Sequence, residues 1–71
     1  MEMTKEFQAK VTQEESPLKN YAIKLTHDQM EAEDLVQDTM LKAFINEDKF
    51  SSGTNLKGWL YTMMKNIFIN K

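Results

Sequence analysis

Apolar residues recur along this chain at spacings of three and four, and strict alternation of apolar and polar residues is absent. Such spacing places side chains on one face of an α-helix and is the main sequence signal for amphipathic helices. Only two glycines and one proline interrupt the pattern. The sequence therefore predicts an all-α domain, a small bundle of three to four helices.

The first part of the chain carries two helical stripes. Phe7 and Val11 share one face of a segment from residue 5 to about 14, which Thr4 could cap. Ser16-Pro17 is typical of a helix start, because serine is a good N-cap and proline suits the first helical position. The stripe that follows consists of Leu18, Tyr21, Ala22 and Leu25. The pattern does not decide between one kinked helix and two helices.

His27-Asp28-Gln29 resembles a turn, and the next helix is predicted from Gln29 to about Asn46 with Asp28 as its cap. Acidic residues in its first turns suit the positive end of the helix dipole. Its expected inner stripe is Ala32, Leu35, Val36, Thr39, Met40 and Ala43.

Residues 47 to 55 are polar and contain a glycine, which predicts a loop with Phe50 as its single apolar anchor. The last helix is expected at about 56 to 70, capped by Thr54 or Asn55. Its expected inner stripe is Leu56, Leu60, Met63 and Ile67.

Composition narrows the possible functions. The chain has 71 residues, enough for one compact domain. It has no cysteine and one histidine, His27, so disulfides are excluded and we expect neither a metal site nor a cofactor. No apolar run approaches the ~20 residues of a membrane span. The N-terminus is charged rather than signal-like, and we expect a cytoplasmic protein.

A net charge of −2 argues against a stand-alone DNA-binding protein, so any nucleic-acid role should depend on a larger partner. Catalysis has little support, because the carboxylates lie on a helix expected to be exposed, with no base or nucleophile nearby in sequence. We expect no enzyme, and an acid–base enzyme would need a carboxylate in a closed pocket.

Residues outside the inner stripes are the functional candidates. On the middle helix they form a second stripe, with apolar side chains beside acids: Asp34, Gln37, Asp38, Leu41 and Ile45. Such a face suggests a partner helix. The alternative is that another helix of this domain covers it.

The outer face of the last helix mixes basic and aromatic residues: Lys57, Tyr61, Lys65 and Phe68. Trp59, Thr62 and Asn66 flank it. This mixture suits phosphates and unpaired bases. The alternatives are a solubilising face for the lysines and simple burial for Trp59.

Two ordered motifs resemble region 2 of the sigma-70 family of RNA polymerase sigma factors, of the extracytoplasmic-function (ECF) type. They are Ala32-Glu33-Asp34-Leu35-Val36-Gln37-Asp38-Thr39-Met40-Leu41-Lys42-Ala43-Phe44 and, after Phe50, Gly53-Thr54-Asn55-Leu56-Lys57-Gly58-Trp59-Leu60-Tyr61-Thr62-Met63-Met64-Lys65-Asn66. The resemblance covers about residues 7 to 70.

The resemblance implies that the first motif docks on the clamp helices of the polymerase beta-prime subunit. The docking residues would be Asp34, Gln37, Asp38 and Leu41, with Phe44 and Ile45 at the edge. It also implies that the last helix helps to open the promoter minus-ten element and to hold its non-template strand. Trp59, Thr62, Lys65 and Asn66 occupy the matching positions, with Lys57 and Tyr61 as weaker candidates.

The sequence departs from the family by stopping at Ile69-Asn70-Lys71, before the family's basic stretch and its second DNA-binding domain. We therefore expect residues 1–71 to be a truncated sigma region 2 rather than a natural remnant, with an apolar patch that could promote self-association. An anti-sigma factor is a further possible partner. The alternative function is a small helical protein-interaction module without a promoter role.

Overall fold

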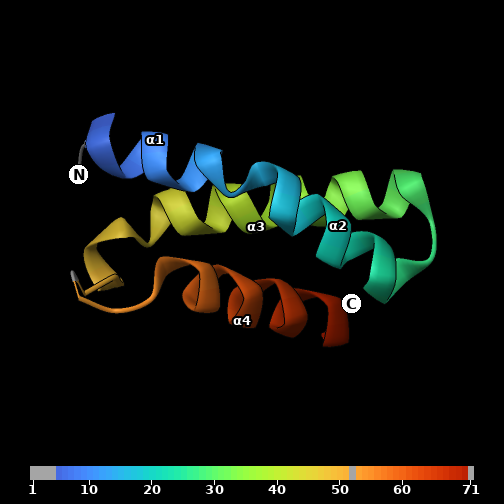
Figure 1. The fold of residues 1–71 in the computed structure, drawn as a ribbon. Coiled ribbons are helices and arrows are strands. Elements are labelled where there is room, and N and C mark those ends of the chain that lie inside the picture. The colour runs from blue at the N-terminus through green and yellow to red at the C-terminus, as the bar shows by residue number, and fades with distance from the viewer. Residues whose placement is uncertain (1–4, 52, 71) are drawn as a thin grey trace.

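The computed structural model describes residues 5–51 and 53–70, and within these residues the protein is helical and contains no strand. The elements are α1 (Lys5–Gln13), α2 (Glu15–Thr26), α3 (Gln29–Ile45), the 3₁₀ turn η1 (Glu47–Lys49) and α4 (Leu56–Ile69). In Figure 1, α1 and α2 follow one another along α3, and both α2 and α4 run antiparallel to it. The predicted all-α bundle is confirmed.

The break between α1 and α2 lies at Glu14, so the first part of the chain forms two helices. The Glu14 N–H donates to the carbonyl of Val11 at 3.0 Å, a tighter bond than the α-helical one. The predicted start at Ser16-Pro17 was wrong, because α2 already begins at Glu15. Pro17 is still tolerated there, since the first turn of a helix has N–H groups without intrahelical partners.

The start of α3 is fixed by the predicted cap. Asp28 is extended, and its carboxylate accepts hydrogen bonds from the backbone N–H groups of Met30 at 2.8 Å and Glu31 at 3.2 Å. His27 adopts the left-handed conformation (φ 57°) that commonly ends a helix, and its N–H donates to Ile23. These two residues turn the chain from α2 into α3. The predicted cap Thr4 lies outside the described residues.

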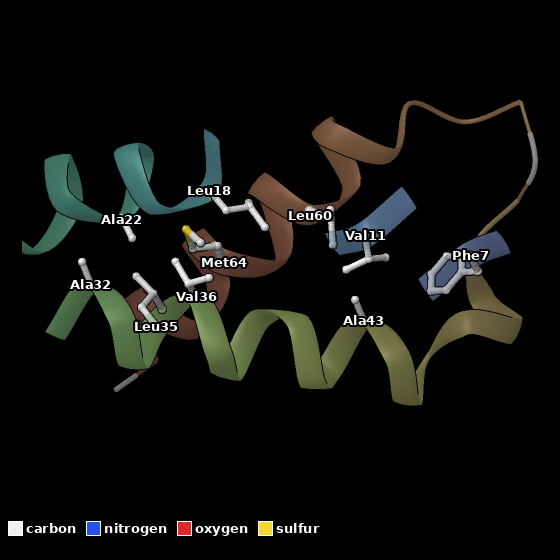
Figure 2. Close-up of a cluster of buried hydrophobic side chains, with 10 residues drawn as sticks. All are labelled: Phe7, Val11, Leu18, Ala22, Ala32, Leu35, Val36, Ala43, Leu60 and Met64. Carbon is white, nitrogen blue, oxygen red and sulfur yellow. The ribbon is translucent and has the colours of Figure 1, made fainter. Parts of the chain in front are cut away.

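The core runs along α3, which packs against all three other α-helices. Figure 2 shows its buried side chains: Phe7, Val11, Leu18, Ala22, Ala32, Leu35, Val36, Ala43, Leu60 and Met64. Thr39 is also buried, and its hydroxyl donates to the Leu35 carbonyl at 2.7 Å, which satisfies the polar group. Met40 is half-buried at the edge. The inner stripe predicted for α3 is therefore confirmed.

The inner stripe predicted for α4 was only partly right. Leu60 is buried, but Met64 is the second fully buried side chain, and it was not predicted. Three predicted members are half-buried: Leu56, Met63 and Ile67. The reason is that α4 packs against α2 as well as α3, so its buried line points between the two helices.

Phe50 anchors the connection between α3 and α4, as expected. Its ring centroid lies 5.8 Å from Phe7 and 5.1 Å from Trp59, and Phe7 lies 6.2 Å from Trp59. Part of the predicted loop is the 3₁₀ turn η1, while Ser52 lies outside the described residues. Asn55 precedes α4, as one of the two expected caps, without a side-chain capping bond. The aromatic cluster fixes the start of α4 against α1.

Candidate functional site

The face of α3 opposite the core carries a stripe of exposed side chains, here called the docking stripe: Asp34, Gln37, Asp38, Leu41 and Ile45. The two apolar members are strongly exposed, Leu41 at 60% and Ile45 at 70%. No helix of the described part of the chain covers them. The interpretation that another helix of this domain packs on this stripe was therefore wrong.

The two flanks of the stripe differ. Phe44 was expected at its edge, and it is half-buried and packs against the core. Gln37 borders a shallow groove toward α2, where Lys19 and Glu33 form an ion pair of 3.4 Å. The stripe thus combines two carboxylates, one amide and two apolar side chains on a rigid helix.

An open hollow of about 280 Å³ lies between α3 and α4. Its lining, here called the α3–α4 hollow, consists of Lys42, Asn46, Lys49, Trp59, Thr62, Met63 and Asn66. Three of these residues were predicted to bind DNA: Trp59, Thr62 and Asn66. The structure brings them together and adds two lysines and a second amide from α3 and η1.

The hollow has one aromatic wall and several polar groups. Trp59 is half-buried, so it is neither fully buried in the core nor fully exposed. Its ring packs on Phe7 and Phe50 and also lines the hollow. Asn46 donates from its amide Nδ2 to the Lys42 carbonyl at 2.8 Å, which orients the amide at the end of α3. This arrangement can stack a flat ring, hydrogen-bond its edge and attract an anion.

Sequence reasoning missed Lys42, Asn46 and Lys49. Lys42 and Asn46 are four residues apart and so share a face of the chain, beside the docking stripe. That spacing could have marked a second functional flank of α3. Their meeting with α4 could not be predicted without the packing of the two helices.

The other predicted DNA-binding residues do not line the hollow. Tyr61 is half-buried, and its ring stacks on Tyr21 of α2 with centroids 4.7 Å apart. The Lys57 ammonium lies 3.8 Å from the carboxylate of Glu14. Lys65 is exposed. The continuous outer face predicted for α4 was wrong, because Tyr61 and also Phe68 pack against the rest of the bundle.

Within the described residues, no three acidic, histidine or cysteine side chains converge on a point that could hold a metal ion. Each helix described is too short or too polar to cross a lipid bilayer.

The family model of sigma-70 region 2 matches residues 11–71. The chain belongs to the sigma-70 family. The ECF RNA polymerase sigma factor EcfG of Rhodopseudomonas palustris (strain TIE-1) is 45% identical over 51 residues, and RNA polymerase sigma factor YlaC of Bacillus subtilis (strain 168) is 39% identical over 51. The sigma region 2 and the ECF type predicted from the two motifs are both confirmed. Proteins of this family are transcription factors rather than catalysts.

A solved structure supports the same conclusion. Sigma factor RpoE of Bartonella quintana, crystallised in complex with the anti-sigma factor NepR, is similar over 94% of this chain, with a TM-score of 0.87 and 40% identity. The similar part is 42% of that chain. Against the two curated relatives, the alignment covers 72% of this chain and only 28% and 30% of theirs.

Proposed function

We propose that residues 1–71 act as a sigma region 2 domain, which docks on the clamp helices of the RNA polymerase beta-prime subunit and helps to melt the promoter minus-ten element. The observation that carries the proposal is the division of α3: one face forms the core, the opposite face is the exposed docking stripe, and the flank toward α4 borders the hollow. Such a protein would act with the polymerase in the cytoplasm and would support transcription initiation.

The docking stripe has the chemistry of a protein-binding surface. Leu41 and Ile45 are apolar side chains that water surrounds in the free chain, and their burial against a partner would be favourable. Asp34 and Asp38 can each accept hydrogen bonds from an arginine, and bonds between charged partners are the strong ones. Apolar side chains that become buried beside a polar, charged margin are the usual composition of a protein–protein interface.

The α3–α4 hollow suits an unpaired nucleotide. An extruded base could stack on Trp59, which is worth about 1–3 kcal/mol per base. Asn46 and Asn66 carry both donors and acceptors for the edge of that base, while Lys42 and Lys49 suit the adjacent phosphates. The base would be held only after it leaves the duplex, so binding here favours the melted strand. Because the net charge is −2, this contact should need the polymerase to bring the strand close.

Docking can be tested by calorimetry with the isolated beta-prime clamp coiled coil at moderate salt. We expect saturable binding, weakened about tenfold by Asp34→Ala or by Gln37→Ala. Glu6→Ala is a control, because it removes an acidic side chain that is 82% exposed on α1. A folded wild-type chain that does not bind would refute the docking assignment.

The hollow can be tested with the chain bound to core polymerase and a fluorescent single strand of minus-ten sequence. Trp59→Ala should weaken binding by about tenfold, the low end expected for losing a stacked base. Asn66→Ala should weaken it by a similar factor, through lost hydrogen bonds to the edge of the base. Lys10→Ala is the control, since it removes a lysine of α1, outside the hollow. Equal loss with all three variants, the Lys10 control included, would indicate an effect that is not specific to the hollow, and no loss with either hollow variant would refute base binding there.

A second candidate function is that of a helical interaction module with no promoter role. The acidic net charge and the exposed stripe favour it over autonomous DNA binding. It predicts clamp or other helix binding without any preference for single-stranded minus-ten sequence.

A partner of the anti-sigma type is also proposed, because RpoE of Bartonella quintana was crystallised with one. Self-association stays a prediction, which sedimentation of the isolated chain would test.

A further inference from the structure

Met30 is the most exposed large apolar side chain of the described residues, at 78%. It lies one helical turn before Asp34, and at 100° per residue it is displaced only about 20° around the α3 axis from Leu41. Its backbone N–H donates to the carboxylate of Asp28 at 2.8 Å, which anchors the backbone of residue 30 in the first turn of α3. Met30 therefore extends the same line of side chains as the docking stripe.

The other exposed large apolar side chains show how unevenly they are distributed. They are Ile23 on α2, Leu41 and Ile45 on α3, and Ile69 on α4. Met30, Leu41 and Ile45 share one line on a single helix, while the other two lie on different helices. Gathered apolar exposure marks an interaction surface, whereas a single exposed residue does not. Methionine is also well suited to a binding surface, because its flexible thioether adapts to its partner.

We propose that Met30 is a second apolar anchor of the docking surface, at the end opposite Leu41 and Ile45, and that the partner is a helix with a matching order of residues. Along α3 the order is apolar at Met30, acidic at Asp34 and Asp38, and apolar again at Leu41 and Ile45. From Met30 to Ile45 the helix rises about 22 Å. The partner helix carries apolar side chains at both ends of that length and basic side chains, best arginine, between them. This inference rests on the proposed docking function and adds a contact to it.

The test is calorimetric titration of the 71-residue chain with the isolated beta-prime clamp coiled coil. Met30→Ala should weaken binding about 3- to 10-fold, and Leu41→Ala should weaken it at least as much. Met30→Leu should keep the wild-type affinity, because it retains an apolar side chain of similar volume. Ile69→Ala is the matched control: it truncates an apolar side chain that is 63% exposed on another helix, and it should have no effect.

Met30→Ala should not destabilise α3, because alanine is a better helix former than methionine. The hydrogen bond to the Asp28 carboxylate also involves only the backbone of residue 30. Circular dichroism of each variant checks this. Weaker binding with Leu41→Ala but unchanged binding with Met30→Ala would overturn the Met30 anchor and leave the proposed function standing. Absence of binding by the folded wild-type chain would overturn both.

Discussion

Tyr21 of α2 and Tyr61 of α4 stack with their ring centroids 4.7 Å apart and their planes inclined by 20°. Both rings are half-buried at the edge of the core, so the pair joins the two helices that flank α3. Tyr61→Ala should lower the free energy of unfolding by about 1–3 kcal/mol, from lost ring burial and lost stacking. Tyr61→Phe keeps the ring and should cost under about 1 kcal/mol. Urea unfolding measures both, and equal losses would show that the stacking is unimportant.

The buried line of α4 runs through Leu60 and Met64 rather than Met63. Met64→Ala should cost about 2–5 kcal/mol of stability, because it leaves a cavity beside α3. Met63→Ala is the matched comparison: its side chain is half-buried and lines the hollow, and we expect a clearly smaller loss. Thermal unfolding of the two variants would contradict the structure if Met63→Ala were the more damaging.

Asp28 makes the two capping bonds that start α3. Asp28→Ala should therefore destabilise the protein by about 0.5–2 kcal/mol. Asn55 occupies the corresponding position before α4 but makes no side-chain capping bond. Asn55→Ala should therefore lower the stability by only a few tenths of a kcal/mol. Denaturant titrations compare the two. Similar losses would mean that the capping bonds of Asp28 contribute little.

Trp59 is the only tryptophan in the chain, so its fluorescence reports directly on the hollow. Phe50→Ala removes one of the two rings that pack against the Trp59 ring, and it should shift the emission maximum to longer wavelength as water gains access. The loss of a half-buried ring should also cost about 1–3 kcal/mol of stability. Phe68→Ala, on the last turn of α4, is the comparison and should leave the emission unchanged. An unshifted spectrum for Phe50→Ala would show that Phe50 does not shield the Trp59 ring from water.

Much of this fold was predictable because single residues determine it locally. Asp28 marked the start of α3 by capping chemistry alone, and the spacing from Ala32 to Ala43 marked its buried face. The docking stripe could be predicted from the residues of α3 that the core face does not use, because Leu41 and Ile45 lie outside that face. In α4, apolar residues occupy most positions, so periodicity alone could not choose between Met63 and Met64. That choice depends on α2 and α3 together.

The hollow shows a second limit of sequence reasoning. Trp59, Thr62 and Asn66 could be grouped by their spacing on one helix, but Lys42, Asn46 and Lys49 join them only through the packing of α3 against α4. Tyr61 was assigned to an exposed face because its partner, Tyr21, lies forty residues earlier in the sequence. The lining of the hollow and the burial of Tyr61 therefore depend on contacts between distant segments of the chain, which periodicity does not reveal.

Most positions of α3 have a role in packing or in a proposed binding surface, so this helix should tolerate few substitutions. One side of this helix fills the core, the opposite side carries the docking stripe, and Lys42 and Asn46 border the hollow on a third side. Few of its positions remain where an amino acid could change freely. On the solvent-facing side of α1, Glu6 and Lys10 form a surface ion pair of 3.4 Å. A saturation library of this chain should therefore lose most of its active members in α3, while α1 accepts substitutions that preserve Phe7 and Val11.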